Sequence, residues 1–362
     1  MQFPNSFIIL PFIVSFAATT ILTPLTIAIL KKLRIVDDPK LHKHPGIIHK
    51  KPIPRGGGIP LFLGTFIACI IFLPKTTITI ALSIASFLAL LIGIIDDVLN
   101  AKSADVSPYI RFLINIITAV IVVGSGISIH FITNPFGGGI IHLDSIRLPI
   151  LNFFISDVVS VFWLIWIMNM INWSKGVDGQ MPGIVAISAI TIGLLSLKLN
   201  PQVNLTSFLD VKLSFIIAGS ALGFLVYNFY PAKIFPGYGA TSIYLLLGVV
   251  SILSSAKLAT AILVMGVPTI DAVLTIFRRI LNKRSPFRHD NKHLHHNLLK
   301  LGYSQRQIAL FYWTISAILG LISLTLDSKS KIFALVMLTV IVGGILFFLH
   351  SVIKDTNEKN VA

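Results

Sequence analysis

Long apolar runs alternate with short polar segments along most of the chain. A helix needs about 20 apolar residues to cross a hydrocarbon layer about 30 Å thick. Runs near that length predict eleven membrane-spanning helices, at Phe7–Leu30, Gly57–Leu73, Ile78–Ile95, Ile110–Gly126, Phe153–Ile171, Gly183–Leu197, Leu213–Phe229, Thr241–Leu253, Leu258–Phe277, Ala309–Leu326 and Ile332–Leu349. We therefore expect an all-α polytopic membrane protein that forms one integral-membrane domain over residues 1–362.

One segment between the predicted spans has a different pattern. Residues 127–150 alternate Ile with polar residues, as in Ile127-Ser128-Ile129, and they carry Gly and Pro. A period of two bounded by turn residues is typical of a β-hairpin. The segment predicts a small hairpin on the external side of the membrane.

Composition supports a membrane protein. Hydrophobic residues make up 55% of the chain and charged residues only 12%, whereas soluble domains are about one quarter charged. The single cysteine, Cys69, excludes a disulfide framework and a cysteine-rich metal site. A disordered chain and a water-soluble globule do not fit this composition.

The charge is unevenly distributed. Lys and Arg number 29 against 14 Asp and Glu, a net charge of +15. If the N-terminus lies outside, the inward-facing segments hold 22 of the 29 basic residues: 31–56, 96–109 with the adjoining Arg111, 172–182, 230–240, 278–308 and 350–362. The positive-inside rule favours this orientation in a plasma (inner) membrane. No basic domain interleaved with aromatic residues is present to suggest nucleic-acid binding.

Asp96 and Asp97 close the third predicted span. The carboxyl end of a helix carries partial negative charge, and two adjacent carboxylates repel each other. A cation must compensate the pair, either Mg²⁺ or Lys/Arg. The alternative is a solvated helix end that only sets the topology.

A second polar motif ends the fifth predicted span. Asn169 and Asn172 are three residues apart and share a helix face. Two amides there can bind the edge of a base or offer oxygen atoms to a hard cation. Gly176 and Gly179 permit tight turns around Asp178. The alternative is a polar helix cap.

Two glycine-rich segments and a histidine-rich loop lie on the same predicted side. Arg55 precedes three glycines that would let a phosphate approach the backbone, and residues 231–242 form a second anion-binding candidate at a helix N-terminus. The cytoplasmic loop 278–308 carries basic and imidazole side chains: Arg288, His289, Lys292, His293, His295 and His296. Without cysteine ligands, a phosphate-binding or proton-handling pocket is favoured over zinc. An ordinary linker, a plain turn and a solvated basic loop are the respective alternatives.

Taken in order, these motifs resemble the polyprenyl-phosphate N-acetylhexosamine-1-phosphate transferases of glycosyltransferase family 4. That family includes undecaprenyl-phosphate GlcNAc-1-phosphate transferase and phospho-MurNAc-pentapeptide translocase. The resemblance runs from about Asp37 to Gly302. It rests on the ordered segments Pro52–Gly57, Asp96-Asp97, Asn169–Gly179, Asn228–Phe235 and His293–His296.

The resemblance implies a reaction and its partners. A polyprenyl phosphate, such as undecaprenyl phosphate, attacks the β-phosphate of a UDP-N-acetylhexosamine in a cleft at the cytoplasmic face. The products are polyprenyl-diphosphate-sugar and UMP, the first membrane step of cell-envelope glycan synthesis. Mg²⁺ is implied as cofactor, with Mn²⁺ as an alternative ion. The context of Ser285-Pro286-Phe287 and Asp290 favours GlcNAc. The lipid bilayer is a further partner, and a homodimer is left open.

The resemblance also implies roles for individual residues. The catalytic residues implied are Asp96, Asp97 and Asp178, and the metal ligands are Asn172 and Asp97. The substrate-binding residues implied are Arg55, Asn169, Lys175, Lys292, His293, His295 and His296.

Two positions depart from the family pattern. Lys175 stands where the family has an Asp, and Tyr238 stands where it has an Asp that binds metal. A phenol with a pKa near 10 cannot replace a carboxylate as a ligand of Mg²⁺ at neutral pH. Three hypotheses follow. The chain is an active transferase in which Lys175 replaces part of the metal charge, or a homologue that binds polyprenyl phosphate or UDP-sugar without turnover, or a multi-span transporter. The last is disfavoured because transporters place polar residues near the bilayer midplane.

Overall fold

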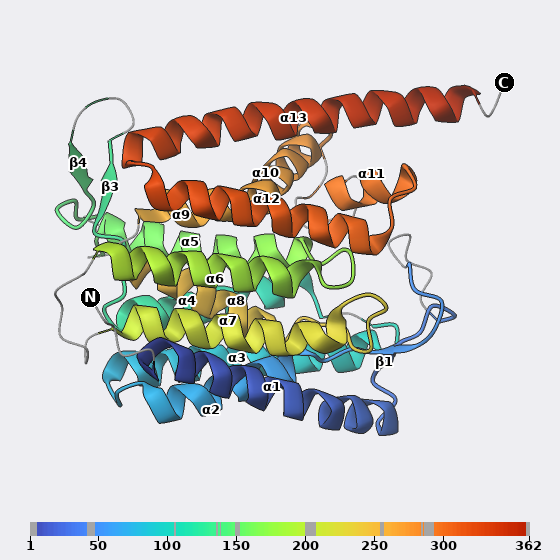
Figure 1. Ribbon diagram of the computed structural model, residues 1–362, viewed down its shortest axis with the longest axis horizontal. Coiled ribbons are helices and arrows are strands. Elements are labelled where there is room, and N and C mark those ends of the chain that lie inside the picture. Colours follow the sequence, from blue (N-terminus) through green and yellow to red (C-terminus); the bar gives the residue numbers. More distant parts are fainter. Residues whose placement is uncertain are drawn as a thin grey trace.

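The protein is a bundle of helices. The computed structural model describes residues 6–41, 48–104, 106–134, 137, 139–148, 153–199, 208–253, 257–283, 285 and 293–359. Its helices are α1 (Ser6–Lys32), α2 (Gly58–Phe72), α3 (Thr77–Asn100), α4 (Pro108–Gly124), α5 (Ile155–Trp173), α6 (Gln180–Leu199), α7 (Leu209–Asn228), α8 (Thr241–Leu253), α9 (Lys257–Val264), α10 (Gly266–Leu281), α11 (Leu294–Lys300), α12 (Gln305–Thr325) and α13 (Ser328–Lys359). Most of them run side by side along one direction (Figure 1).

Two short antiparallel strand pairs lie at opposite ends of the bundle (Figure 1). β1 (Val36–Asp37) pairs with β2 (Ile53–Pro54) at one end. At the other end β3 (Phe131–Thr133) pairs with β4 (Ile140–His142), within the segment whose alternation predicts a hairpin. The side of the membrane on which β3 and β4 lie stays a prediction.

The helices bear out a polytopic all-α membrane protein. Among the described residues, seven helices are long and apolar enough to span a membrane: Phe7–Lys32, Thr77–Asn100, Ile155–Trp173, Gln180–Leu199, Leu209–Asn228, Gln305–Thr325 and Ser328–Leu346. The pair α9 and α10 would make an eighth span, and α2, α4 and α8 are shorter apolar helices. All of them overlap predicted spans, but the number eleven stays a prediction.

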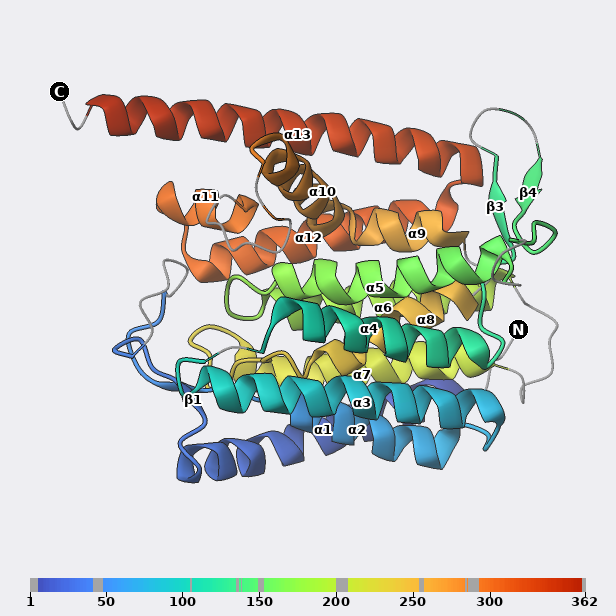
Figure 2. The ribbon, with the colours of Figure 1, turned by 180° about the vertical axis from the view of Figure 1, so that it is seen from behind.

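One predicted span is broken. The run Leu258–Phe277 was expected to form a single helix, whereas Leu258–Val264 and Gly266–Leu281 meet at 87°. The sequence at the break is Met265-Gly266-Val267-Pro268. Proline lacks an N–H and clashes with the preceding turn, so a continuous helix through this point is disfavoured. Figure 2 shows α10 crossing the direction of its neighbours beneath α13.

Small and hydroxyl-bearing residues hold α1, α2 and α7 together. Thr19 of α1 donates to Ser220 of α7 at 2.9 Å, and Ser220 donates to the Leu61 carbonyl of α2 at 3.0 Å. A Cβ at Gly64 or Gly219 would overlap atoms of α1. Close backbone approach and interhelical hydrogen bonds are how helices associate in lipid, where burial of apolar surface between them gains little.

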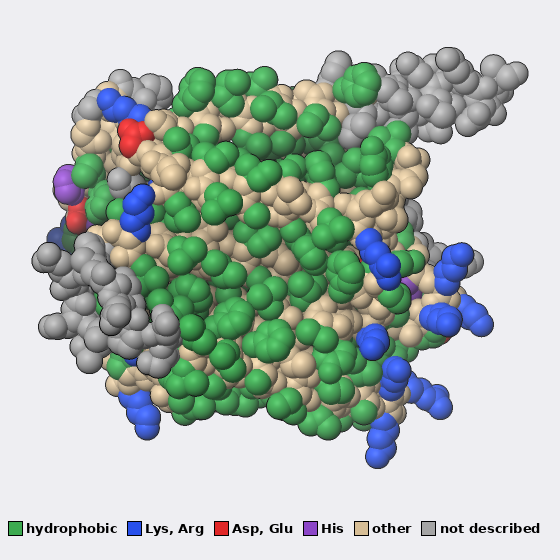
Figure 3. All heavy atoms as spheres, in the orientation of Figure 1, with side chains coloured by type: hydrophobic (Ala, Val, Ile, Leu, Met, Phe, Trp, Pro, Cys, Tyr) green, Lys and Arg blue, Asp and Glu red, His purple; other side chains and the backbone are tan. Residues whose placement is uncertain are grey.

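The outside of the bundle is apolar. Large side chains such as Ile21, Phe162 and Phe333 are at least 65% exposed, and hydrophobic side chains cover the face in Figure 3. A continuous apolar surface of this kind marks contact with a membrane. Lys and Arg side chains gather mainly at the end of the bundle that carries β1 (Figure 3).

Candidate active site

A candidate site lies at this basic end, where segments distant in the sequence meet. Residues 53–58 run beside residues 235–236: Arg55 bridges Phe235, the Phe235 N–H donates to the Pro54 carbonyl at 2.8 Å, and the Gly58 N–H donates to the Pro236 carbonyl at 2.9 Å. The backbone thereby holds Arg55 next to the loop that precedes α8. The carboxyl end of α3 and the turn after α5 complete the cluster.

The two carboxylates of α3 each have their own guanidinium partner. Asp97 Oδ1 accepts from Arg55 Nε at 3.1 Å and from the Tyr238 N–H at 2.9 Å. Asp96 accepts from Arg111 Nη1 at 3.2 and 3.3 Å. The side chains of the pair are therefore compensated by arginine, one of the two kinds of cation that the sequence predicts. Asp96 and Asp97 are 0% and 1% exposed, so neither carboxylate reaches solvent.

The other oxygen of Asp97 lies against a glycine. Asp97 Oδ2 is buried and has no hydrogen-bond partner among the described residues. Gly237 covers it with a φ of +65°, and a Cβ at Gly237 would overlap the carboxylate. Only glycine combines this left-handed backbone with such close approach.

Lys175 reaches into the same cluster from the turn after α5. Its Nζ donates to Asn172 Oδ1 at 2.9 Å and to the Gly237 carbonyl at 2.8 Å. Asn172 in turn donates through Nδ2 to Thr241 Oγ1 at 2.8 Å. Burial first, and then the positive charge of Arg55, lower the pKa of Lys175 to about 7. An anion bound beside the amine would favour its charged form.

Tyr238 sits between the two α3 carboxylates and α4. Its ring lies 5.2 Å from Arg111 Cζ and 5.9 Å from Lys175 Nζ, and its hydroxyl accepts from Asn115 Nδ2 at 3.2 Å. Burial raises the pKa of Tyr238 to about 12. The phenol therefore stays neutral at physiological pH and brings no negative charge to the cluster.

Asp178 lies in a separate part of the site. Its Oδ2 accepts from the Ala232 N–H at 2.9 Å, and its N–H donates to Gln305 Oε1 at 3.1 Å. Burial raises the pKa of Asp178. These contacts tie the turn after α5 to the loop after α7 and to the start of α12.

The histidines cover this turn from α11. His293 Nδ1 lies 2.8 Å from Asp271 Oδ2, and the Leu294 N–H donates to Asp271 Oδ1 at 3.0 Å. The rings of His295 and His296 are 4.3 Å apart. His295 packs directly on Gly176, where a Cβ would overlap the imidazole. The structure thus brings His295 and the Lys175 turn together.

The structure does not join two of the predicted site residues to this cluster, one because of its own contacts and the other because it is not among the described residues. Asn169 donates to the Ile165 carbonyl of its own helix at 2.8 Å, and it has no side-chain hydrogen bond to the Lys175 cluster among the described residues. Lys292 lies outside the residues that the structure describes. The roles of all the predicted residues stay predictions.

Sequence reasoning missed several members of the cluster. Arg111 and Asn115 of α4 have no neighbouring motif to mark them. Gln305 is an ordinary helix-start residue, whereas Thr241 lies within the predicted anion-binding segment 231–242. Asp271 is an acidic residue within the predicted span Leu258–Phe277. Its charge at that position was the available signal, because an ionisable residue in a membrane helix is a functional candidate by default.

The donor set does not match the expected divalent-metal site. No group of three His, Cys, Asp or Glu residues suited to a metal occurs among the described residues. The predicted ligand Asn172 has its amide oxygen bonded to the Lys175 ammonium, and Tyr238 supplies a neutral phenol. Mg²⁺ prefers several oxygen ligands with octahedral geometry. The Mg²⁺ requirement stays a prediction.

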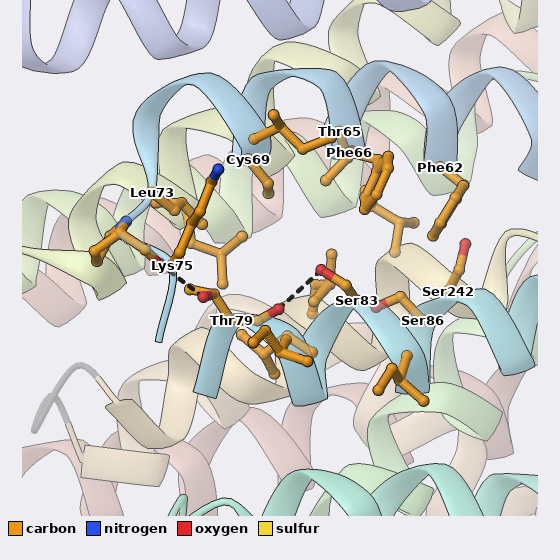
Figure 4. A pocket seen from close by; sticks show the side chains of 18 residues that line it. Phe62, Thr65, Phe66, Cys69, Leu73, Lys75, Thr79, Ser83, Ser86 and Ser242 are labelled. Atoms are coloured by element: carbon orange, nitrogen blue, oxygen red, sulfur yellow. Dashed lines mark hydrogen bonds between the residues drawn. The ribbon is translucent and has the colours of Figure 1, made fainter. Parts of the chain in front are cut away.

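An apolar groove lies between α2 and α3, and residues of α7 and α8 also line it (Figure 4). The cavity has a volume of about 250 Å³ and lies between α2, α3, α7 and α8. Phe62, Phe66 and Cys69 face Ser83 and Ser86 across it (Figure 4). Ser242, next to the Thr241 that Asn172 contacts, also lines the groove.

Comparison with known proteins places this fold and site in a class. The chain belongs to glycosyl transferase family 4, whose model matches residues 79–255. The probable undecaprenyl-phosphate N-acetylglucosaminyl 1-phosphate transferase of Bacillus subtilis (strain 168) is 30% identical over 97% of this chain and 94% of its own length. The decaprenyl-phosphate N-acetylglucosaminephosphotransferase of Mycolicibacterium smegmatis is 29% identical over 74% and 70%. The phospho-N-acetylmuramoyl-pentapeptide-transferase of Moorella thermoacetica is 27% identical over 87% and 97%.

This membership excludes one of the three sequence-based hypotheses. The chain is a transferase of a sugar-phosphate family, and the transporter hypothesis is set aside.

Asp157, an acidic residue in a predicted span, accepts from Ser128 Oγ at 2.6 Å and from the Phe154 N–H at 3.4 Å. It serves the start of α5, where a negative charge is favourable.

Proposed function

We propose that the protein transfers GlcNAc-1-phosphate from UDP-GlcNAc to a polyprenyl phosphate, giving polyprenyl-diphosphate-GlcNAc and UMP. The carrying observation is the cluster of Arg55, Arg111 and Lys175 around the α3 carboxylates, at the end of a membrane bundle. Phosphoryl transfer depends mainly on positioned positive charge and alignment, because the protein has little covalent chemistry to do. The named relatives act on the same class of acceptor.

The two carboxylates act through their arginines in this proposal. Because Asp96 and Asp97 are buried, they position Arg111 and Arg55 rather than touch the substrates themselves. A phosphate monoester has a second pKa of about 6, so the lipid phosphate is largely a dianion at neutral pH. It can attack the β-phosphorus without a general base, and UMP leaves as a stable phosphate.

The apolar groove supplies a place for part of the isoprenoid chain of the acceptor. Its walls are mainly Phe, Ile and Leu side chains, and it reaches Ser242 beside the cluster. An isoprenoid chain buries apolar surface in such a groove at about 25 cal/mol per Å². The lipid phosphate would then lie near the Lys175 turn while the chain extends toward the other end of α3.

The orientation completes the proposal. The charged cluster faces the cytoplasm and the N-terminus lies outside, in the plasma (inner) membrane. The support is the concentration of basic residues at the end that carries β1. UDP-sugars are made in the cytoplasm, which fits a donor site on that face.

The test is release of UMP by the purified full-length protein from UDP-GlcNAc and undecaprenyl phosphate. UMP and a lipid-linked sugar should appear in equal amounts. Silence across a panel of UDP-sugars, with undecaprenyl and decaprenyl phosphates, would contradict the proposal. Binding of either substrate without UMP release would instead support the hypothesis of a homologue without turnover, which the replacements at Lys175 and Tyr238 keep open.

A further inference from the structure

The Lys175 ammonium contacts two oxygen atoms of the kind that bind hard cations. Its ammonium contacts the Asn172 amide oxygen at 2.9 Å and the Gly237 carbonyl oxygen at 2.8 Å. Amide and carbonyl oxygens are typical ligands of Mg²⁺ and Ca²⁺. The buried Asp97 Oδ2, without a hydrogen-bond partner in the described part of the chain, lies close to Gly237.

The surrounding charges work against a second cation at this point. Arg55 forms an ion pair with Asp97, and Arg111 forms one with Asp96. The charges of both carboxylates are therefore already compensated. The aromatic ring near Lys175 Nζ belongs to Tyr238, which is neutral. A divalent ion would have to displace the ammonium from Asn172 while remaining close to three positive side chains, and like charges at such distances repel strongly.

We propose that Lys175 is the resident cation of the transfer site, so that the reaction proceeds without a bound divalent metal. This inference rests on the proposed transferase function. Two N–H groups of the ammonium are held by Asn172 and Gly237, which leaves the third to a diphosphate oxygen of the nucleotide sugar. Charge-assisted hydrogen bonds to phosphate are strong, and lysine acts there as a compact point charge.

The reaction balances with this assignment. An oxygen of the lipid phosphate forms a bond to the β-phosphorus of the donor. The bond between that phosphorus and the bridging oxygen breaks, and its electron pair stays on UMP. Lys175 and Arg55 stabilise the charge on the diphosphate and on the departing UMP. No proton, oxidant or further reactant is needed.

The experiment compares turnover with and without metal. Full-length wild type and variants are assayed for UMP release after EDTA treatment and again with Mg²⁺ in excess. The wild type should keep its rate within about twofold, whereas Lys175→Met should lose at least about a hundredfold under both conditions, since a charge placed on a transferring phosphoryl group contributes about 10³–10⁵. Lys198→Met is the matched control, because Lys198 contacts the Leu324 carbonyl, away from the cluster. It should behave as wild type.

A second readout does not depend on activity. Mn²⁺ titration followed by electron paramagnetic resonance should show no saturable site in the wild type. The double variant Lys175→Asp with Tyr238→Asp should gain one, and any turnover that it shows should become sensitive to EDTA. A monodisperse elution profile and a cooperative melt confirm that each variant is folded.

The outcomes separate the two proposals. If EDTA abolishes wild-type turnover and Mg²⁺ restores it, the transferase stands and Lys175 is not the resident cation. If the wild type releases no UMP with or without Mg²⁺, the proposed function fails. The Mn²⁺ titration then still shows whether the wild type holds a divalent metal. A saturable Mn²⁺ site in the wild type that disappears in Asn172→Ala overturns the inference. A site present only in the double variant supports it.

Discussion

At the scale of single residues, Arg55 connects several parts of the site through its side chain and its backbone. Its guanidinium bonds to Asp97 Oδ1 at 3.1 Å and to Asp37 Oδ2 at 3.5 Å, and its backbone bridges Phe235. Burial lowers the pKa of Arg55, whereas the neighbouring Asp97 and Asp37 carboxylates raise it. The net effect is a raised pKa. Arg55 therefore remains charged at any pH in use.

Arg55→Met should both destabilise the protein and stop turnover. It leaves the Asp97 carboxylate buried, with the Tyr238 N–H as its remaining donor among the contacts described. Removing one partner of a buried ion pair costs about 3–5 kcal/mol. Thermal melts in detergent and the UMP assay measure the two effects. Arg147→Met, an exposed arginine beside Phe154, is the control and should change neither. A stable, active Arg55→Met protein would show that Asp97 does not need this partner.

A second residue-scale prediction concerns the contact of Gly176 with His295. A side chain at Gly176 would overlap the imidazole, whereas a Cβ at Gly124 has open space around it. Gly176→Ala should lower the melting temperature by several degrees, since overpacking costs about 1–3 kcal/mol. Gly124→Ala should leave it unchanged or raise it slightly. Adding His295→Ala to Gly176→Ala should restore part of the loss. No restoration would mean that the strain arises elsewhere.

Single residues of the site could be predicted from the sequence, but most of their contact partners could not. Asp96, Asp97, Asn172, Lys175 and Asp178 could be singled out because they stand in compact motifs at span ends. Their partners could not. Arg111 and Asn115 meet the cluster only because α4 packs against α3, and the Gly237 carbonyl acts through backbone geometry that no side-chain pattern records. The structure also shows the Asn169 amide bonded to the Ile165 carbonyl of its own helix, a contact that the sequence pattern did not indicate.

At the scale of elements, hydrophobic runs identify helices better than they locate helix ends. α3 continues to Asn100, so Asp96 and Asp97 lie inside its last turns rather than after it. α6 begins at Gln180 with Pro182 in its first turn, where a missing N–H costs nothing. The break between α9 and α10 has a sequence cause, Gly266 and Pro268, but its 87° angle depends on packing against α12 and α13.

If the groove between α2 and α3 binds the isoprenoid chain, narrowing it should affect long acceptors more than short ones. Ser83→Phe would fill the groove wall of α3 beside Phe66 and Cys69. The apparent KM for undecaprenyl phosphate should rise about tenfold, because about 1.4 kcal/mol of apolar contact corresponds to that factor. A prenyl phosphate of two or three isoprene units, too short to fill the groove, should be affected little. Leu91→Phe, on the exposed side of the same helix, is the control. An equal effect on long and short acceptors would place the isoprenoid chain elsewhere.

At the scale of the whole molecule, charge and topology converge on one face. Segments far apart in the sequence bring their polar residues to the end that carries β1, although they are separated by apolar helices. An apolar bundle cannot hold these charges along its length, since an unpaired charge in hydrocarbon is costly. The site therefore lies where the helices reach water, and the few charges placed deeper, such as Asp271, are paired.

This arrangement fixes an orientation that labelling can check. Lys50 is exposed near β2, at the cluster end, and Lys75 is exposed in the α2–α3 connection at the other end. In a Cys69→Ala background, which removes the single native thiol, Lys75→Cys should react with a membrane-impermeant maleimide on intact cells. Lys50→Cys should react only after lysis. UMP release by both variants confirms that they keep the native fold. The reverse pattern would put the cluster outside, where UDP-sugars are absent, and the positive-inside argument, the donor and the proposed reaction would fail together.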